Sequence, residues 1–98
     1  MNIQAMMKQA QKLQKDMMKT KEEVEKKEFE GKSSFVTVRA NGAKEILSVK
    51  INQDEITSED KEILEDMILL AVNDVLKKID KEMEEKMGSY TNGIPGLF

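Results

Sequence analysis

Four regularly spaced lysines are the residues of this sequence best suited to binding chemistry. Lys8, Lys12, Lys15 and Lys19 lie three or four positions apart in the stretch MMKQAQKLQKDMMK, residues 6–19. A lysine ammonium is a point charge that can neutralise a phosphate without reading base sequence. Lysines on the polar side of an amphipathic helix also keep it soluble, so the residues alone leave both interpretations open.

Other kinds of chemistry lack their usual residues. The 98 residues include no histidine, cysteine or tryptophan, which removes the commonest general base, the thiolate nucleophile and the usual transition-metal ligands. No glycine-rich phosphate-binding motif is present, and acidic pairs such as Glu65 and Asp66 are typical of a solvated helix face. We therefore expect no catalytic residue, metal site, cofactor or small-molecule substrate, and a protein that is not an enzyme.

Charge is unevenly distributed along the chain. Residues 1–21 carry five lysines and one aspartate, whereas residues 54–66 carry seven acids and one lysine, within a net charge of −3. The length favours a single domain, residues 1–98. Because the sequence has no cysteine and no apolar run long enough to span a membrane, we expect a cytoplasmic protein without disulfides and without a membrane partner.

The apolar pattern predicts a long N-terminal helix over about residues 3–27. Its apolar positions alternate in spacings of three and four, with threonine at one of them: Ile3, Met6, Ala10, Leu13, Met17, Thr20 and Val24. This spacing places them on one face of a helix, and it places the four lysines on the opposite face.

The alternating and β-branched residues of the segment 28–52 predict a three-stranded antiparallel β-meander. The first turn is expected within residues 31–34, and the second at Asn41-Gly42, a strong signal for a two-residue type I′ hairpin. That short turn would set Val36 opposite Leu47.

The same turn would place Arg39 directly opposite Lys44, on a sheet face that also carries Lys50. Like charges in that position repel each other. We consider two interpretations of this face: a solvated surface neutralised by nearby glutamates, and a patch that faces an anion.

A second long helix is predicted over about residues 58–87. Thr57 or Ser58 is the expected N-cap, and Gly88 is expected to end the helix. Residues 88–98 are then expected to form a flexible C-terminal tail.

The centre of this second helix carries more apolar side chains than one sheet face readily covers. We expect the excess to form a homodimer interface, unless the first helix and the sheet cover it within one chain. The predicted interface residues are Met67, Ile68, Leu69, Leu70 and Val72. Further along, Lys77, Lys78 and Lys81 lie outside the apolar pattern and form a second candidate basic set.

Several segments, in order, resemble the YbaB/EbfC family of bacterial nucleoid-associated proteins, and together they cover nearly the whole chain. The segments are Lys-Gln-Ala-Gln at residues 8–11, the Asn-Gly turn, the acidic block at residues 60–66 followed by Asn73-Asp74, and Pro-Gly-Leu-Phe at residues 95–98.

The resemblance implies an α+β subunit, a homodimer with helical arms, and binding to DNA that alters its conformation, with roles in nucleoid organisation and gene regulation. Carried onto this chain, it favours Lys8, Lys12, Lys15 and Lys19 as DNA contacts and, as a second set, Lys77, Lys78 and Lys81. The alternative is a protein-interaction scaffold whose coiled-coil-like first helix binds no DNA.

Overall fold

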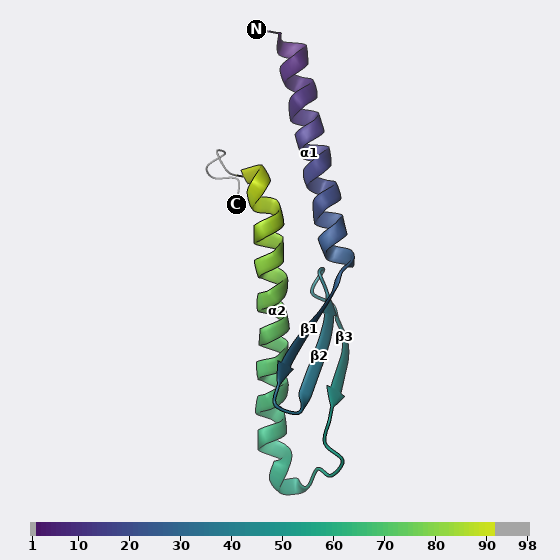
Figure 1. Ribbon diagram of the computed structural model, residues 1–98, viewed down its shortest axis with the longest axis vertical. Helices are drawn as coiled ribbons and strands as arrows, with labels where there is room; N and C mark the ends of the chain where they lie inside the picture. The colour runs from purple at the N-terminus through teal and green to yellow at the C-terminus, as the bar shows by residue number, and fades with distance from the viewer. Residues whose placement is uncertain (1, 92–98) are drawn as a thin grey trace.

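The computed structural model describes residues 2–91 of the chain. Helix α1 (Ile3–Lys26) is followed by strands β1 (Glu28–Ser33), β2 (Val36–Asn41) and β3 (Ile46–Ile51), a 3₁₀ turn η1 (Ser58–Asp60) and helix α2 (Lys61–Thr91). The two helices run antiparallel, and the sheet lies against the first half of α2 (Figure 1). The molecule is elongated, 71 Å along its longest axis, and the predicted α+β order is confirmed.

Helix α1 begins at a side-chain cap. The Oδ1 atom of Asn2 accepts a hydrogen bond from the backbone N–H of Gln4 at 3.0 Å, which satisfies one of the donors left free at a helix start. No proline or glycine interrupts the 24 residues of the helix. The predicted span of residues 3–27 is confirmed to within one residue.

The first hairpin turns later than the sequence indicated. Ser34 and Phe35 form its turn, with Ser34 at a φ of 52°, whereas Gly31 lies inside β1. Gly31 is needed for packing: a Cβ there would lie 2.3 Å from the carbonyl oxygen of Ala71. The expected turn at residues 31–34 is wrong because this glycine permits close approach of β1 to α2.

The second hairpin also differs from the prediction. Its loop runs over residues 42–45, and the backbone N–H of Asn41 donates to the carbonyl of Glu45 at 3.1 Å. The positive φ of 67° belongs to Lys44. A Cβ on Gly42 would lie 1.9 Å from the carbonyl oxygen of Val24, so Gly42 serves contact with the end of α1.

The register of β3 shifts as a consequence. Val36 pairs with Ile51, not with Leu47, and Arg39 pairs with Ser48, not with Lys44. The shift is four residues, an even number, so Val36 and Ile51 still share one face of the sheet. A bulge between Arg39 and Ala40 takes up the change near the turn.

Helix α2 starts from the 3₁₀ turn and runs past the predicted end. The carboxylate of Asp60 accepts from the backbone N–H of Thr57 at 3.0 Å, which supports Thr57 as the cap. The helix continues through Gly88 to Thr91, so the predicted end at residue 87 is wrong. Intrahelical hydrogen bonds tolerate a single glycine at a cost of about 1 kcal/mol relative to alanine. The remainder of the predicted tail lies outside the described residues.

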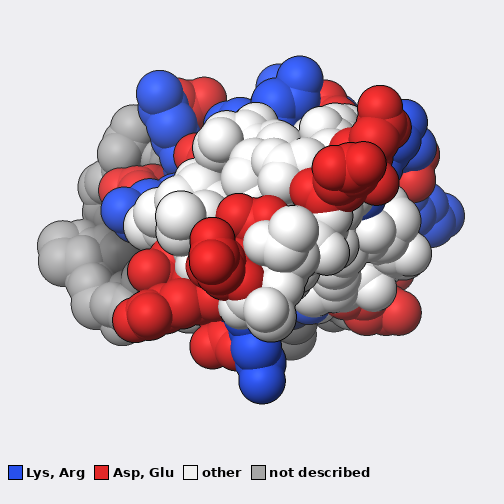
Figure 2. All heavy atoms as spheres, turned by 90° about the horizontal axis from the view of Figure 1, so that it is seen from below, with Lys and Arg blue, Asp and Glu red and all other residues white. Residues whose placement is uncertain are grey.

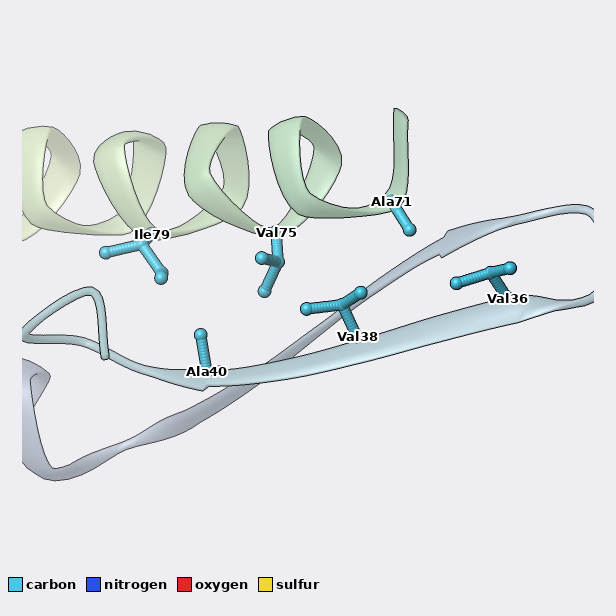
Figure 3. Packing of buried hydrophobic residues seen from close by; sticks show 6 residues of the cluster. All are labelled: Val36, Val38, Ala40, Ala71, Val75 and Ile79. Atoms are coloured by element: carbon cyan, nitrogen blue, oxygen red, sulfur yellow. The ribbon is translucent and has the colours of Figure 1, made fainter. Parts of the chain in front are cut away.

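The core lies between α2 and one face of the sheet. Six side chains, all at most 1% exposed, interlock there: Val36, Val38, Ala40, Ala71, Val75 and Ile79 (Figure 3). The helix residues recur every four positions and the β2 residues every two, so each set points to the shared layer. This packing fixes α2 across β1 and β2.

The end of α1 and the residue that follows it contact the second half of α2. The hydroxyls of Thr20 and Tyr90 lie 2.9 Å apart, and the Nζ of Lys27 donates to Glu82 at 3.0 Å. Residues 3–19, which we name the arm, continue past this contact toward the N-terminus (Figure 1). Val24 is 2% exposed at the base of α1, whereas Ile3 is 72% exposed at the tip.

Candidate nucleic-acid interface

The arm carries an exposed basic face. Lys8, Lys12, Lys15 and Lys19, which we name the arm lysines, are all exposed. Their spacing puts them opposite the apolar positions that approach α2 at the base of the helix. At about 1.5 Å of rise per residue, they cover about 16 Å of helix length. Such a row of charges is long enough to follow several phosphates of a nucleic-acid backbone.

Little negative charge offsets the arm lysines. Within the arm the sole acid is Asp16, which is half-buried. None of the four lysines forms an ion pair with another residue in the described range. Their ammonium groups therefore keep their donors available for an external anion.

The three lysines of the second basic set, Lys77, Lys78 and Lys81, differ in their contacts. Lys77 and Lys81 are exposed on α2. Lys78 is engaged within the fold: its Nζ donates to the Glu30 carbonyl at 2.9 Å and lies 3.3 Å from Asp74. Lys78 thus joins α2 to β1.

Asp74 completes this connection between helix and strand. Its carboxylate accepts the backbone N–H of Lys32 at 3.0 Å. That hydrogen bond holds the pKa of Asp74 below its ordinary value, and the hydrogen bond from Lys78 makes the next largest contribution. The group is a structural anchor of β1.

The structure does not join the two basic sets within one chain. The contact between Thr20 and Tyr90 marks where α1 and α2 meet near the base of the arm. Lys81 precedes Tyr90 by nine residues, or about 13 Å along α2, toward the sheet. The arm lysines extend in the other direction.

The contacts of the sheet face with Arg39 fit a solvated surface that is neutralised by nearby glutamates. Arg39 pairs with Glu28 at 3.1 Å, as expected for a solvated face neutralised by a nearby glutamate. Lys44 reaches α2 and pairs with Asp80 at 2.7 Å. Lys50 is exposed. Two of the three cations in the suggested anion patch are therefore already paired.

The predicted interface residues divide into two groups. Met67, Ile68 and Val72 are half-buried and pack against the core within the chain. Leu69 and Leu70 are 59% and 52% exposed. The core of the chain itself therefore covers part of the apolar centre of α2, and Leu69 and Leu70 remain exposed on the surface.

Strand β3 adds an apolar surface that the sequence pattern did not indicate. Four of its large side chains are between 38% and 48% exposed: Ile46, Leu47, Val49 and Ile51. The cause is geometric, because a helix about 10 Å wide covers about two strands spaced about 4.8 Å apart. Here α2 covers β1 and β2, which leaves β3 at the open edge.

Further exposed apolar residues lie where β3 ends and α2 begins. Ile56 is 42% exposed and Ile63 is 53% exposed. Figure 2 views this end of the molecule, where uncharged surface (white) is interrupted by several acidic side chains (red), and the visible Lys and Arg side chains (blue) lie toward the outline. This end lies opposite the tip of the arm (Figure 1).

The described residues offer neither a metal cluster nor a membrane-spanning helix. In residues 2–91, no group of three or more histidine, cysteine, aspartate or glutamate side chains is arranged to hold a metal ion. No helix in that range combines the length and apolar character needed to cross a membrane.

A three-stranded sheet packed on one long helix, with a second helix projecting as a lysine-bearing arm, defines a small α+β protein with a candidate polyanion-binding surface. Residues 1–94 match the model of the YbaB/EbfC DNA-binding family. The chain belongs to that family, and the resemblance inferred from its motifs is confirmed.

Relatives of known name match the chain along nearly its whole length. A protein of Lactococcus lactis subsp. cremoris is 50% identical over 97 residues, which cover 97% of this chain and 98% of the relative. A protein of Ligilactobacillus salivarius is 43% identical, covering 99% and 95%. One of Enterococcus faecalis is 43% identical, covering 98% and 94%. All three are named nucleoid-associated proteins.

Proposed function

We propose that this chain is a nucleoid-associated protein that binds duplex DNA as a homodimer, with little sequence preference. One observation carries the proposal: the four arm lysines are exposed on a projecting helix and form no ion pair with the described part of the chain. Membership in a DNA-binding family supports DNA as the polyanion.

The arm lysines are suited to phosphate contact and poorly suited to base recognition. Each lysine that meets a phosphate releases condensed counterions, which favours binding and makes it depend on salt. Specific readout relies mostly on bidentate side chains such as arginine. The arm contains no arginine, and Arg39 is paired with Glu28. Because such contacts involve only the sugar-phosphate backbone of the DNA, we expect weak sequence selectivity.

The second basic set is proposed as a subsidiary contact. Lys77 and Lys81 are exposed and can reach a phosphate that passes along α2. Lys78 contributes least, because binding DNA would require it to leave Glu30 and Asp74.

The apolar surface at β3 and α2 supports the proposed homodimer. Val49 and Ile51 lie on the sheet face that carries the core, beyond the part covered by α2. Leu69 and Leu70 add exposed apolar area from α2. A second copy that covers this surface by two-fold symmetry would bury it on both subunits.

Such a dimer leaves both arms available. The proposed interface lies toward the end of the molecule opposite the arm tip (Figure 1). Two rows of lysines held by one rigid core would contact a duplex at two places, and that constraint can bend or stiffen the DNA. We propose that this action takes place in the nucleoid.

The alternative of a scaffold that binds no DNA is not favoured. It interprets the arm lysines as a solubility surface alone. That interpretation accounts for their exposure but not for the family to which the chain belongs.

A mobility-shift experiment tests the proposal. The wild type is compared on one duplex with a variant in which the four arm lysines are glutamine, and with a control in which they are arginine. The arginine control keeps the charge, so it should bind like the wild type. At about 0.1 M salt the glutamine variant should bind about 10³-fold more weakly for each arm in contact. Equal binding by the glutamine variant, or no binding by the wild type at low salt, would refute the proposal.

A further inference from the structure

The two edges of the sheet differ in how their backbone groups are satisfied. Strand β1 forms one edge and β3 the other, and an edge strand presents a row of N–H and C=O groups that can pair with another chain. Side chains of α2 close the edge of β1. The carbonyl of Glu30 accepts from the Nζ of Lys78 at 2.9 Å, and the N–H of Lys32 donates to Asp74 at 3.0 Å. These side chains occupy the place that a further strand would take beside β1.

The edge of β3 has no such cover. The N–H of Asn52 donates to the carbonyl of Phe35 at 2.7 Å, which fixes the side of β3 that faces β2. Backbone groups alternate between the two sides of a strand, so residues 48 and 50 also face β2. The residues whose N–H and C=O groups face outward are Leu47, Val49 and Ile51. No strand lies beyond them in the described part of the chain (Figure 1).

The open edge of β3 continues into the apolar surface beside α2. Val49 and Ile51 lie on the sheet face that carries the core, yet they are 46% and 38% exposed. Leu69 borders the same area, because it precedes Asp80 by 11 residues, or about three helical turns. Asp80 pairs with Lys44 in the loop that leads to β3, so this side of α2 faces β3. Open backbone groups and exposed apolar side chains therefore form one surface.

The residue pattern of β3 matches a second copy of the same strand. Residues 47–51 read Leu-Ser-Val-Lys-Ile, so apolar and polar residues alternate symmetrically about Val49. If two copies run antiparallel with Val49 opposite Val49, Leu47 of each lies opposite Ile51 of the other. Lys50 then lies opposite Ser48. A pairing centred on Lys50 would instead set two lysines opposite each other, which is unfavourable.

We propose that β3 pairs antiparallel with β3 of a second copy, with Val49 opposite Val49, and joins two three-stranded sheets into one. The outward-facing residues of the two strands then exchange about six backbone hydrogen bonds. The two-fold axis is perpendicular to the sheet, so both α2 helices lie on the same face and the apolar residues of the two β3 strands form one layer between them. This inference rests on the proposed homodimer and names the strand through which it forms.

Cysteine cross-linking tests the pairing, because the natural chain has no cysteine. Val49→Cys sets its two copies opposite each other with their Cα atoms about 5.5 Å apart, within the range of a disulfide. Leu47→Cys is the matched control, since Leu47 is similarly exposed on the same edge. Its two copies would be about 13 Å apart, too far to bridge. Under mild oxidation Val49→Cys should form the interchain disulfide about tenfold faster than the control, or faster still.

Sedimentation of the wild type at the same concentration separates failure of this inference from failure of the homodimer. A dimeric wild type combined with equal cross-linking rates, or with faster cross-linking of Leu47→Cys, would refute the β3 pairing and leave the homodimer in place. A wild type that sediments as a monomer of 11.2 kDa would overturn both.

Amide hydrogen exchange in the wild-type dimer provides a second readout that needs no substitution. The N–H groups of residues 48 and 50 bond to β2 within the chain, so they serve as internal references. Those of residues 47, 49 and 51 should be protected to within about tenfold of the references, because the second copy accepts their hydrogen bonds. Exchange more than about tenfold faster at these three positions in a dimeric sample would contradict the pairing.

Discussion

Replacing Gly31 by alanine tests how tightly the sheet packs on α2. The added Cβ would lie 2.3 Å from the carbonyl oxygen of Ala71 and 2.5 Å from the backbone nitrogen of Val75. Both neighbours are helix backbone, so neither can rotate away. An ordinary contact requires α2 and β1 to separate by about 1 Å, and a gap of that size forfeits about half of the local dispersion attraction.

The expected cost is at the upper end of the range for overpacking. Forcing one extra methyl into a packed core costs about 1–3 kcal/mol, and a clash with rigid backbone places Gly31→Ala near about 3 kcal/mol. For a domain of this size, that corresponds to a fall in Tm of about 12–24 °C. Small domains have a total stability of about 5–15 kcal/mol, so the variant should fold but melt early.

Gly88→Ala is the matched control. Apart from its chain neighbours and the backbone of its own helix, a Cβ at Gly88 would meet no described atom within 4 Å, and the position lies inside α2. The same substitution should therefore stabilise the protein by about 0.5–1 kcal/mol through helix propensity. Thermal and urea unfolding, followed by circular dichroism at one protomer concentration, measures both variants. If the two variants were equally stable, the close contact between β1 and α2 would be refuted.

Three further predictions follow from the core, from Asp74 and from the proposed interface. Ile79→Ala should cost about 2–5 kcal/mol in urea unfolding, whereas Ile63→Ala, at an exposed position, should cost less than about 1 kcal/mol; equal costs would contradict the assigned core. The pKa of Asp74 is lowered on folding, so its stabilisation is complete above its unfolded pKa of about 3.9 and is lost as pH falls through the lower folded value. Asp74→Asn should therefore destabilise the protein at pH 7 and converge with the wild type in acid, and a constant difference across pH would refute this role. Leu69→Lys with Val49→Lys should sediment as a monomer of 11.2 kDa at micromolar concentrations at which the wild type sediments at twice that mass, and a monomeric wild type would remove the dimer proposal.

The helices were predictable because their signals are local. Six apolar residues and Thr20 of the first helix repeat with the helical period over 22 residues, which places them on one face of the helix that the structure shows. The alternation in β2 likewise predicted which residues reach the core. These patterns depend on neighbours within one element, so no knowledge of the fold was needed.

The turns were mispredicted because two glycines serve contacts between distant segments. Gly31 was interpreted as a turn residue but lies inside β1, and Gly42 lies in its turn as expected, yet each is also held against the backbone of a helix. Sequence alone cannot separate the two uses of glycine, because both require the absence of a Cβ. The register error still kept the correct faces between Val36 and Arg39, since the shift there was an even number of residues, whereas the bulge beyond Arg39 pairs Ala40 with Ile46.

The candidate site was predictable in composition but not in arrangement. Helical spacing placed the arm lysines on one face, and the structure leaves them exposed. Lys78 looked equivalent to Lys77, and only the position of β1 shows that Lys78 is engaged by Glu30 and Asp74. The projection of the arm and the exposure of β3 likewise depend on where α2 lies, which is a tertiary property.

The central claim is that the arm lysines neutralise DNA phosphates. Its most direct test is the slope of log binding constant against log salt concentration, measured on one duplex for the wild type and for the variant with all four arm lysines changed to glutamine. The slope should become shallower by about 3.6 for each arm that contacts the duplex. The same slope for both proteins would contradict the claim.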